Sequence, residues 1–434
     1  MATPNTTPDI SLPALPPPTN LSTPPAVQAL TKLAERAVRP DSHHDTPAVK
    51  LLRDTLLDAA ARGASDIHIE PGEHGWRIRL RIDGLLHETG RPPGHLHDAF
   101  VTRIKVLARL DIAERRTPQD GRLRLPLAAG QIEEYRVNSL PTLYGEKLVL
   151  RRLAAQTSLL TLDALGLSAP QQATLSMALA APHGMVLVTG PTGSGKTVSL
   201  YCFLQMLNSV SLNLCSVEDP AEIQLAGVNQ VSVRDKAGLT FASALRAFLR
   251  QDPDVIMVGE IRDPETADVA VKAAQTGHRV LSTLHTNDAP ATLARLLDIG
   301  VAPFNLASAV RLITAQRLIR KLCPACRVAG TLSRTEMRAA GFPTEQLFGG
   351  WPAFTAGGCA ACHGIGYRGR VGIHQVMPIS APMREIIVAR GSAQALAQQA
   401  RDEGVLSLRD AALASVRAGV TSLAEAMAAT EASS

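Results

Sequence analysis

The stretch "GPTGSGKT", residues 190–197, constrains the fold of this chain more than any other feature. It directly follows the apolar run 185–188, and apolar residues at helical spacing follow it from Leu200 to Leu207. A strand that ends in a glycine-rich turn and restarts as a helix points backbone N–H groups and the positive helix end at phosphate oxygens. The pattern predicts a nucleotide site, with a chance glycine loop as the alternative.

Within this loop, Lys196 is expected to reach the β- and γ-phosphates of ATP, and the hydroxyl of Thr197 to coordinate Mg²⁺. The following helix would begin at Lys196. The residues expected to hold the nucleotide are Gly190, Pro191, Thr192, Gly193, Ser194, Gly195, Lys196 and Thr197.

Hydrolysis also needs carboxylates, and two acidic segments follow apolar runs. Glu218 begins "EDPAE" after an apolar stretch, and Glu260 follows the run 255–258 in "DVIMVGEIRD". Residues 255–258 are predicted to form a buried strand, which would direct Glu260 to the phosphate side of a parallel sheet. The alternative is that both are ordinary loop carboxylates. His285 in "STLHTND" is a third candidate, because imidazole can donate to a phosphate oxygen, although a lone histidine is more often structural.

Composition limits the class of partner. The 434 residues suggest two or three domains, and a formal net charge of +5 is spread along the chain, so charge selects no partner. Aromatic residues make up only 3%, which disfavours a nucleic-acid surface of stacked rings. Apolar runs do not reach the roughly 18 residues that span a bilayer, and the N-terminus does not resemble a signal peptide. We therefore expect a cytoplasmic protein.

The pattern along the chain predicts a Pro-rich, mostly disordered tail over residues 1–46, with one short helix around "VQALTKLAERA". An α+β domain follows over 47–155. It begins with a helix that stops at Gly63, continues with paired strands on both sides of Pro71-Gly72, and includes a helix over "VTRIKVLARLDIA". Residues 156–434 alternate strand and helix, which predicts an α/β fold with a doubly wound parallel sheet.

Alternation in the paired strands separates an inner and an outer face. Trp76, Ile78, Leu80 and Ile82 are expected to point inward. The three arginines between them, Arg77, Arg79 and Arg81, are expected to form a solvated outer face.

Four of the six cysteines occur as two C-x-x-C pairs. Residues 327–358 separate the first pair, Cys323 and Cys326, from the second pair, Cys359 and Cys362. Two such pairs can close a tetrahedral site of four sulfurs, and Zn²⁺ is the usual occupant in a reducing compartment. Redox dithiols or free thiols are the alternatives. His363 is not expected to be a ligand, and Cys202 and Cys215 are expected in the core.

Taken together, four segments make the chain resemble a known family. The phosphate loop, "VEDP", "VGEIRDPETA" and "TGHRVLSTLHTNDA" are similar to the Walker A, Asp-box, Walker B and His-box segments of the secretion ATPase superfamily. The chain resembles its assembly branch, the ATPases of type II secretion and type IV pilus assembly, over nearly everything after the tail. The tetracysteine segment agrees with that branch.

The resemblance implies roles for individual residues. Glu218 would activate water, Glu260 would be the Walker B carboxylate near Mg²⁺, and His285, with His278 second, would act beside the phosphates. It also implies a PAS-like N-terminal domain that contributes arginines to a RecA-like ATPase domain, with Arg136 and Arg151 in the matching positions. A solvated strand face is the alternative for these two arginines.

The resemblance further implies a RecA-like domain over 156–434 with a metal-binding subdomain at 321–373 and a helical subdomain at 374–434. Such proteins act as homohexamers with an inner-membrane platform protein and a membrane-bound recruiting protein, so a peripheral location at the inner membrane is expected and nucleic acid is not. A ring that translocates DNA or serves DNA uptake is the alternative. The chain departs from the family in its Pro-rich N-terminus, and "AEIQLAG" lacks an aromatic that often follows the Asp box.

Overall fold

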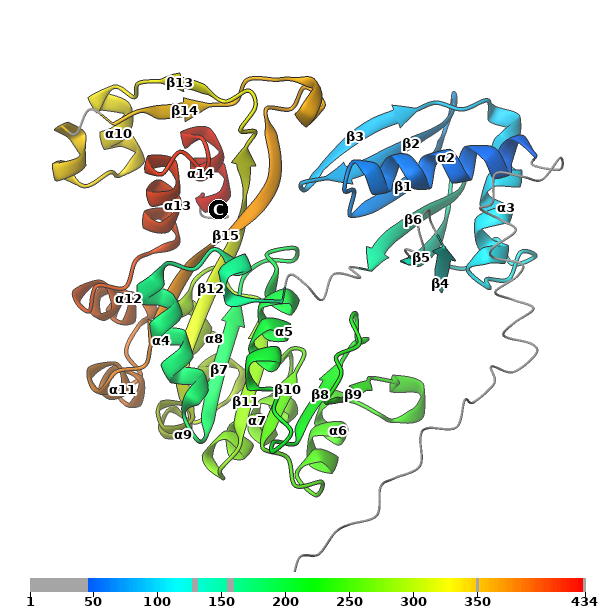
Figure 1. Cartoon of the computed structure of the whole chain (residues 1–434). Helices are drawn as coiled ribbons and strands as arrows, with labels where there is room; N and C mark the ends of the chain where they lie inside the picture. Colours follow the sequence, from blue (N-terminus) through cyan, green and yellow to red (C-terminus); the bar gives the residue numbers. More distant parts are fainter. Residues whose placement is uncertain (1–45, 127–131, 154–159, 349–350, 432–434) are drawn as a thin grey trace, which may run out of the picture. The chain divides into compact units, whose positions relative to one another are not determined.

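Figure 1 shows the computed structural model of the chain, which describes residues 46–126, 132–153, 160–348 and 351–431. These residues form two compact units, one from residues 46–61, 68–78 and 90–150 and the other from 62–67, 79–89 and 151–431. The tail expected over residues 1–46, with its short helix, lies outside the described residues apart from Thr46, and so does the domain boundary expected at residue 155. In the part of the chain that the structure describes, no helix combines the length and apolar character needed to cross a bilayer.

The N-terminal part contains a six-stranded sheet and two helices, α2 and α3. The strand order is β3-β2-β1-β6-β5-β4, and β4 and β5 are antiparallel. Alternation explains its core, because the residues expected to point inward from β2 are buried, and Trp76 among them packs on Phe100 of α3. The elements are α2 (Pro47–Ala61), β1 (Asp66–Gly72), β2 (Gly75–Ile82), β3 (Leu85–Gly90), α3 (His97–Leu107), β4 (Gln119–Pro126), β5 (Ile132–Thr142) and β6 (Gly145–Leu153).

Three details of this part differ from the sequence-based expectation. The turn between β1 and β2 lies at Glu73 and His74, because β1 continues through Pro71-Gly72. Helix α3 begins at His97 and ends at Leu107, earlier than expected at both ends, and Arg109 then takes a left-handed φ of 58°. The outer face of β2 is not merely solvated, since Arg77 donates to Glu70 at 3.1 Å.

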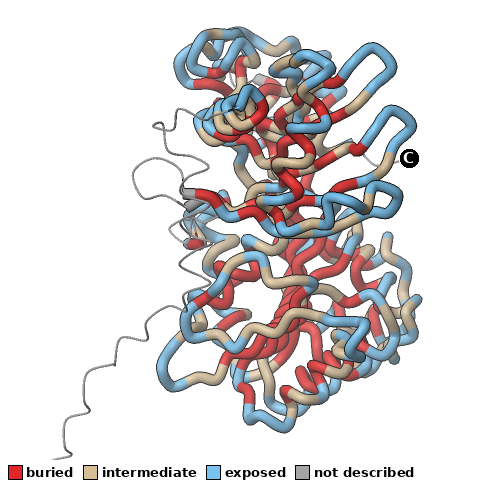
Figure 2. Tube along the Cα trace, turned by 90° about the vertical axis from the view of Figure 1, so that its right-hand side faces the viewer, coloured by how far each residue is buried: buried red, intermediate tan, exposed pale blue. Residues whose placement is uncertain are grey.

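The larger sheet has seven strands in the order β15-β12-β7-β11-β10-β8-β9. The six strands from β12 to β9 in that order are parallel, and β15 is antiparallel to β12. This confirms the prediction of an α/β fold with a parallel sheet. In Figure 2 the buried residues gather along the central strands. The strands are β7 (Gly184–Thr189), β8 (Leu214–Glu218), β9 (Val228–Ser232), β10 (Val255–Val258), β11 (Arg279–Leu284), β12 (Val310–Leu322) and β15 (Tyr367–Pro378).

Helices cover this sheet because its central strands are apolar on both faces, as a parallel sheet requires. Cys202 and Cys215 lie in its core, as expected. The helices are α4 (Ala169–Ala180), α5 (Lys196–Leu207), α6 (Phe241–Phe248), α7 (Pro264–Gln275), α8 (Ala289–Ile299) and α9 (Pro303–Ala309).

Beyond β12 the chain forms a small cysteine-containing segment and then a group of helices. The segment holds a short antiparallel pair, β13 (Val328–Gly330) with β14 (Ala353–Thr355), and helix α10 (Arg334–Ala340). After β15 the chain ends in helices that pack partly against β12 and β15. They are α11 (Ala381–Val388), α12 (Ala393–Asp402), α13 (Leu408–Arg417) and α14 (Leu423–Thr430).

Candidate active site

The predicted phosphate loop occupies the turn between β7 and α5. Strand β7 ends at Thr189, and α5 begins at Lys196. Gly190, Gly193 and Gly195 have φ angles of 147°, 79° and 89°, which side chains rarely tolerate. A Cβ atom on Gly190 would also lie 2.4 Å from the carbonyl oxygen of Gln316. The loop therefore needs glycine for both its conformation and its close approach to β12.

Gln316 of β12 contacts the phosphate loop through its side chain, and this role was not predicted from the sequence. Its Nε2 donates to the carbonyl of Ser194 at 2.8 Å, and its Oε1 accepts from the hydroxyl of Ser199 at 2.8 Å. The side chain is buried, with 2% of the residue exposed. The strand "VRLITAQRLIRKL" also contains Thr314 and four basic residues, so the sequence alone does not single out Gln316.

Lys196 lies in the cradle of its own loop. Its Nζ donates to the carbonyls of Gly190 at 2.8 Å and Pro191 at 3.1 Å. Burial lowers the pKa of this ammonium, and the charge of Glu260 partly opposes that effect. The amine is thus placed among the groups expected to surround phosphate. Thr197 follows it in the first, half-buried turn of α5.

Lys196, His285, Glu260 and Arg262 form a continuous line of groups. The Nδ1 atom of His285 lies 3.4 Å from the Lys196 Nζ, and its Nε2 lies 3.5 Å from Oε2 of Glu260. Arg262 donates to the other oxygen of Glu260 at 2.5 Å. Burial and the Lys196 charge lower the pKa of His285, which favours a neutral ring that accepts at Nδ1 and donates at Nε2.

Helix caps fix the two loops that carry these side chains. After β10, the Asp263 carboxylate accepts the backbone N–H of Thr266 at 2.8 Å and starts α7. After β11, Asp288 accepts the N–H of Ala291 at 2.8 Å and starts α8. A proline in the first turn of each helix reinforces the start, since its fixed φ suits that position. Each motif loop is therefore short and bounded by a strand and a capped helix.

Threonines connect the loop of His285 to the strand before the phosphate loop. The hydroxyls of Thr189 and Thr286 lie 2.5 Å apart, and the N–H of Thr286 donates to Thr189 Oγ1 at 3.0 Å. This contact places His285 beside the phosphate loop. Thr286 belongs to the motif "STLHTND", but its role was not predicted because its partner, Thr189, is far away in the sequence.

Glu218 ends β8, which neighbours β10 in the sheet, and its carboxylate is buried. Oε1 accepts from the hydroxyl of Ser216 at 2.6 Å and from Nε2 of Gln230 at 3.1 Å. Oε2 accepts from the hydroxyl of Tyr201 on α5. Glu218 and Glu260 therefore follow the carboxyl ends of adjacent parallel strands, at the edge where such folds bind ligands.

His278, the second histidine considered, is not part of this group. It precedes β11, whereas His285 follows it, so the strand separates them by roughly 20 Å at about 3.3 Å per residue. Its Nδ1 lies 3.0 Å from the carbonyl of Ala273 instead. We therefore assign it to the opposite edge of the sheet.

Arg136 and Arg151 lie on strands of the N-terminal sheet. Arg136 is half-buried on β5 and is paired in register with Arg122 of β4. The Nε of Arg151 on β6 donates to Asp66 at 2.8 Å, while 63% of the Arg151 side chain is exposed. The guanidinium of Arg151 therefore keeps an exposed face while one edge is bound by a carboxylate. Their part in catalysis stays a prediction.

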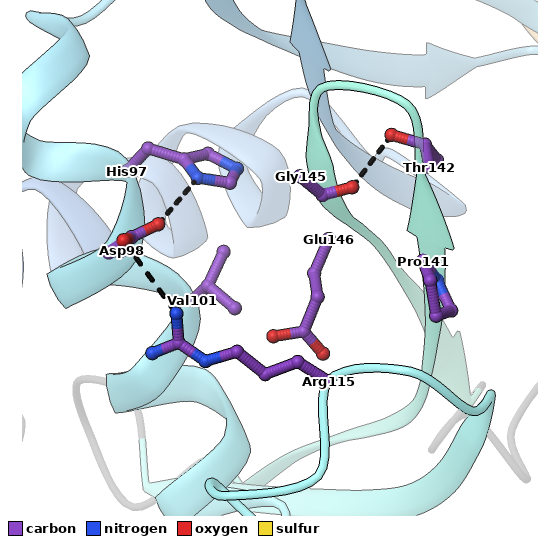
Figure 3. Close-up of a pocket in the computed structure, with 8 residues that line it drawn as sticks. All are labelled: His97, Asp98, Val101, Arg115, Pro141, Thr142, Gly145 and Glu146. Carbon is purple, nitrogen blue, oxygen red and sulfur yellow. Dashed lines mark hydrogen bonds and ion pairs between the residues drawn. The ribbon is translucent and has the colours of Figure 1, made fainter.

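The N-terminal unit contains a separate pocket of about 130 Å³, shown in Figure 3. Asp98 lies 3.3 Å from Nδ1 of His97 and 3.8 Å from Arg115, and Glu146 lines the same pocket. Beside it, the buried ammonium of Lys105 donates to Glu146 at 2.8 Å. Residues predicted for the nucleotide or metal sites do not line this pocket.

The four predicted cysteines converge at the end of the β12–β15 pair where the long connection between the two strands begins and ends. Their sulfur atoms all lie within 4.8 Å of one another, and the Cys323–Cys359, Cys326–Cys362 and Cys359–Cys362 distances are 3.9, 3.7 and 3.7 Å. A tetrahedral site with Zn–S bonds of about 2.3 Å has sulfurs about 3.8 Å apart, so the cluster fits zinc. The N–H groups of Cys359 and Gly366 point at the Cys362 sulfur. His363 is not among the clustered ligands.

Comparison with known proteins extends this picture to nearly the whole chain. Residues 41–428 match the model of the family described as "Type II/IV secretion system protein". The chain is 50% identical to the type IV pilus assembly ATPase PilB of Pseudomonas aeruginosa over 381 residues, which are 88% of this chain and 67% of that protein. It is 43% identical to the type II secretion system ATPase E of Vibrio cholerae over 387 residues, 89% of this chain and 76% of that protein. The chain thus spans about two thirds of the length of the PilB relative.

Solved structures agree on the fold. The pilus retraction motor PilT, solved with bound ADP, is similar with a TM-score of 0.59 and 26% identity over 88% of this chain and 97% of that one. The Legionella pneumophila ATPase DotB has a TM-score of 0.65 and 20% identity over 90% of this chain and 98% of that one. At that identity, the second likeness shows the fold alone.

Proposed function

Since the chain belongs to the family of type II/IV secretion system proteins, we propose that it hydrolyses ATP to drive assembly of a pilus or pseudopilus. Its relatives are ATPases of those two systems, which agrees with the enzyme class predicted from sequence. The observation that carries the proposal is the line of groups from Lys196 through His285 to Glu260 at the end of the phosphate loop. These groups combine a phosphate-binding cation with a carboxylate suited to a metal.

In this proposal, residues 190–197 hold the ATP phosphates with backbone N–H groups and the N-terminal end of α5. Lys196 moves from the carbonyls of Gly190 and Pro191 to the β- and γ-phosphates, for which it is already close and partly desolvated. Mg²⁺ supplies charge neutralisation on the phosphates when bound. Thr197 and Glu260 are the residues of this chain that would hold it.

Glu218 is the proposed base for the attacking water. It lies one strand away from Glu260, and its carboxylate accepts three hydrogen bonds from neighbouring side chains, which leaves room for one more donor. The neutral His285 ring, held between Lys196 and Glu260, would exchange these contacts for the γ-phosphate when ATP arrives. Loss of the γ-phosphate would then change the contacts of His285, whose loop is hydrogen-bonded to β7 through Thr286.

Arg136 and Arg151 are proposed to complete the site when the N-terminal domain closes on a nucleotide. A guanidinium there would neutralise charge that develops on the transferred phosphoryl group. The exposed face of Arg151 and its single-edge contact with Asp66 support this role, because the remaining N–H donors point away from that carboxylate.

Zinc is the proposed occupant of the tetracysteine cluster. The sulfur spacing fits a tetrahedral ion, and the two N–H groups aimed at Cys362 would favour its thiolate form. Zinc bound by four thiolates supplies structural cross-linking and leaves no open position for catalysis.

The proposed assembly is a homohexamer that works with an inner-membrane platform protein and a membrane-bound recruiting protein. We place it at the cytoplasmic side of the inner membrane, where it would associate through these partners. The similarity to pilus assembly and type II secretion ATPases supports these partners as a class.

The function is tested by steady-state ATP hydrolysis with the purified chain. We expect Glu260→Gln to reduce turnover by about 10²-fold or more, since it removes the metal-binding carboxylate. Glu265→Gln is the matched control, because this exposed carboxylate on α7 pairs with Arg246, which is outside the line of groups from Lys196 to Glu260. Unchanged hydrolysis in Glu260→Gln would contradict the assignment. Stimulation by the cytoplasmic domain of a platform protein supports the motor, whereas stimulation by DNA alone would favour a DNA-translocating ring.

A further inference from the structure

Tyr201 joins three parts of the ATPase unit through one buried hydroxyl. It lies on α5, the helix that starts at Lys196, and the residue is fully buried. Its hydroxyl donates to Oε2 of Glu218. The hydroxyl oxygen of Tyr201 also accepts the backbone N–H groups of Glu222 at 3.1 Å and Ile223 at 3.4 Å. One side chain thus connects the phosphate-loop helix, the carboxylate at the end of β8 and the loop after it.

The surrounding contacts show that this loop is built around Tyr201 and Gln230. Gln230 of β9 donates to Glu218 and to the carbonyl of Ile223 at 2.9 Å, and its Oε1 accepts the N–H of Leu225 at 2.7 Å. The loop residues 222–225 therefore have their backbone groups held by two side chains. Both side chains also touch the Glu218 carboxylate, so the position of the loop and that of the carboxylate are linked.

Charge and burial define what the hydroxyl does. Burial first, and then the Glu218 charge, raise the pKa of Tyr201, so the phenol keeps its proton and donates a hydrogen bond to the carboxylate. A carboxylate offers about four acceptor positions, and Ser216, Gln230 and Tyr201 fill three of them. The hydrogen bond from Tyr201 fixes Oε2 of Glu218, and one acceptor position of the carboxylate is left for a water molecule.

We propose that Tyr201 is a positioning residue for hydrolysis, which orients the Glu218 carboxylate and couples it to the helix that carries Lys196. This inference rests on the proposed role of Glu218 as the base. The hydroxyl holds one carboxylate oxygen of Glu218 against α5, the helix that begins at Lys196. Tyr201 itself contacts no phosphate and is not a catalytic residue.

The test compares kcat and KM in Tyr201→Phe, which keeps the ring and removes only the hydroxyl. Loss of this donor releases one carboxylate oxygen of Glu218, so kcat is expected to fall by about tenfold. KM for ATP is expected to stay within about twofold, because the phosphate loop keeps its contacts. A hydroxyl with a purely structural role would change KM and kcat together, because the same helix carries Lys196.

Ser216→Ala is a second variant that supports the same measurement. It removes a different donor from Glu218, at Oε1, and is expected to lower kcat in the same way while KM is kept. Cys202→Ala is the matched control, since Cys202 is the buried neighbour of Tyr201 on α5 and its sulfur lies 3.7 Å from the Thr161 carbonyl. Its kcat is expected to stay within about twofold of the wild-type value.

The outcomes separate this inference from the proposed function. If Glu218→Gln is inactive but kcat is unchanged in Tyr201→Phe, the positioning role is wrong and Glu218 stays the base. If Cys202→Ala lowers kcat as much as Tyr201→Phe, the effect belongs to packing and the role is also wrong. If Glu218→Gln hydrolyses ATP like the wild type, the proposed base is wrong, and the role of Tyr201 falls with it.

Discussion

The side-chain amide of Gln316 donates to the carbonyl of Ser194, although the two residues lie 122 positions apart in the sequence. With its other end Gln316 accepts the hydroxyl of Ser199, so one residue of β12 holds the phosphate loop and the first turn of α5 together. The shape of a loop that binds phosphate thus depends on a strand that enters the fold more than a hundred residues later.

Replacement of Gln316 by leucine should weaken nucleotide binding. The change leaves the Ser194 carbonyl and the Ser199 hydroxyl buried without their partner, at a cost of about 1–3 kcal/mol. We expect the Kd for ADP, measured by fluorescence titration, to rise by about tenfold, the equivalent of about 1.4 kcal/mol. Thr314→Val is the control on the same strand, because the Thr314 hydroxyl is buried and has no hydrogen-bond partner among the described residues. Equal affinities in both variants would contradict the supporting role of Gln316.

The cysteine cluster should contain one zinc ion per chain. We expect metal analysis of the purified protein to find it, and Cys323→Ser or a strong chelator to lower the melting temperature by several degrees, because zinc binding contributes directly to folding. Cys215→Ala, which changes a cysteine in the sheet core outside the cluster, provides the comparison. If the purified wild-type protein contains no zinc and Cys323→Ser has the wild-type melting temperature, the cluster has no structural metal.

Removal of the Arg151 guanidinium should reduce turnover more than stability. An arginine that stabilises the transferred phosphoryl group contributes about 10³-fold or more to kcat. Arg151→Ala is therefore expected to lose most ATPase activity, while its thermal melt changes little, since its pair with Asp66 is largely exposed on the arginine side. Arg77→Ala removes a similar arginine–carboxylate pair from the same sheet and should keep its activity. Similar kcat values for the two variants would argue that Arg151 belongs to a solvated strand face.

Acid should destabilise the ATPase unit through His374. This residue is buried on β15, where its Nε2 lies 2.9 Å from the carbonyl of Leu165, and burial lowers its pKa. The unfolded chain, with a histidine pKa near 6.5, then binds a proton more readily than the folded one, so the free energy of unfolding falls as the pH decreases through about 6.5. Denaturant titrations at about pH 7 and about pH 5.5 should show a smaller fall in His374→Gln than in the wild type. An equal fall would mean that other groups cause the acid sensitivity.

The sequence predicted those parts of the site that are contiguous in it. Glu260 follows its strand and Lys196 opens its helix, because a short apolar run and a glycine turn fix each position locally. The family resemblance, the α/β fold and the ATPase class are confirmed by the comparisons. The cysteine cluster was predicted for the same reason. Each C-x-x-C pair is recognised by its own spacing, even though a long segment separates the two pairs.

The remaining parts depend on partners distant in the chain. Gln316, Tyr201 and Thr189 look like ordinary core or strand residues, and only the folded sheet shows which polar atom each one meets. His278 was grouped with His285 because both occur in one motif, yet a strand between them carries the two to opposite edges. Short motifs therefore identify which strand ends matter, whereas the contacts that orient the side chains follow from topology.

The β12–β15 hairpin has one further consequence, which concerns strand slippage. Gln316 pairs with His374 in this hairpin, and a shift of either strand by one residue would turn its side chains to the other face of the sheet. Gln316 would then leave the phosphate loop, and His374 would leave the carbonyl of Leu165. Two cysteines follow β12 and two precede β15, so an ion shared by all four would oppose such a shift at the end where a long connection replaces a tight turn. The proposed zinc ion would thus keep β12 and β15 in register and Gln316 in contact with the phosphate loop, although the ion lies outside the nucleotide site.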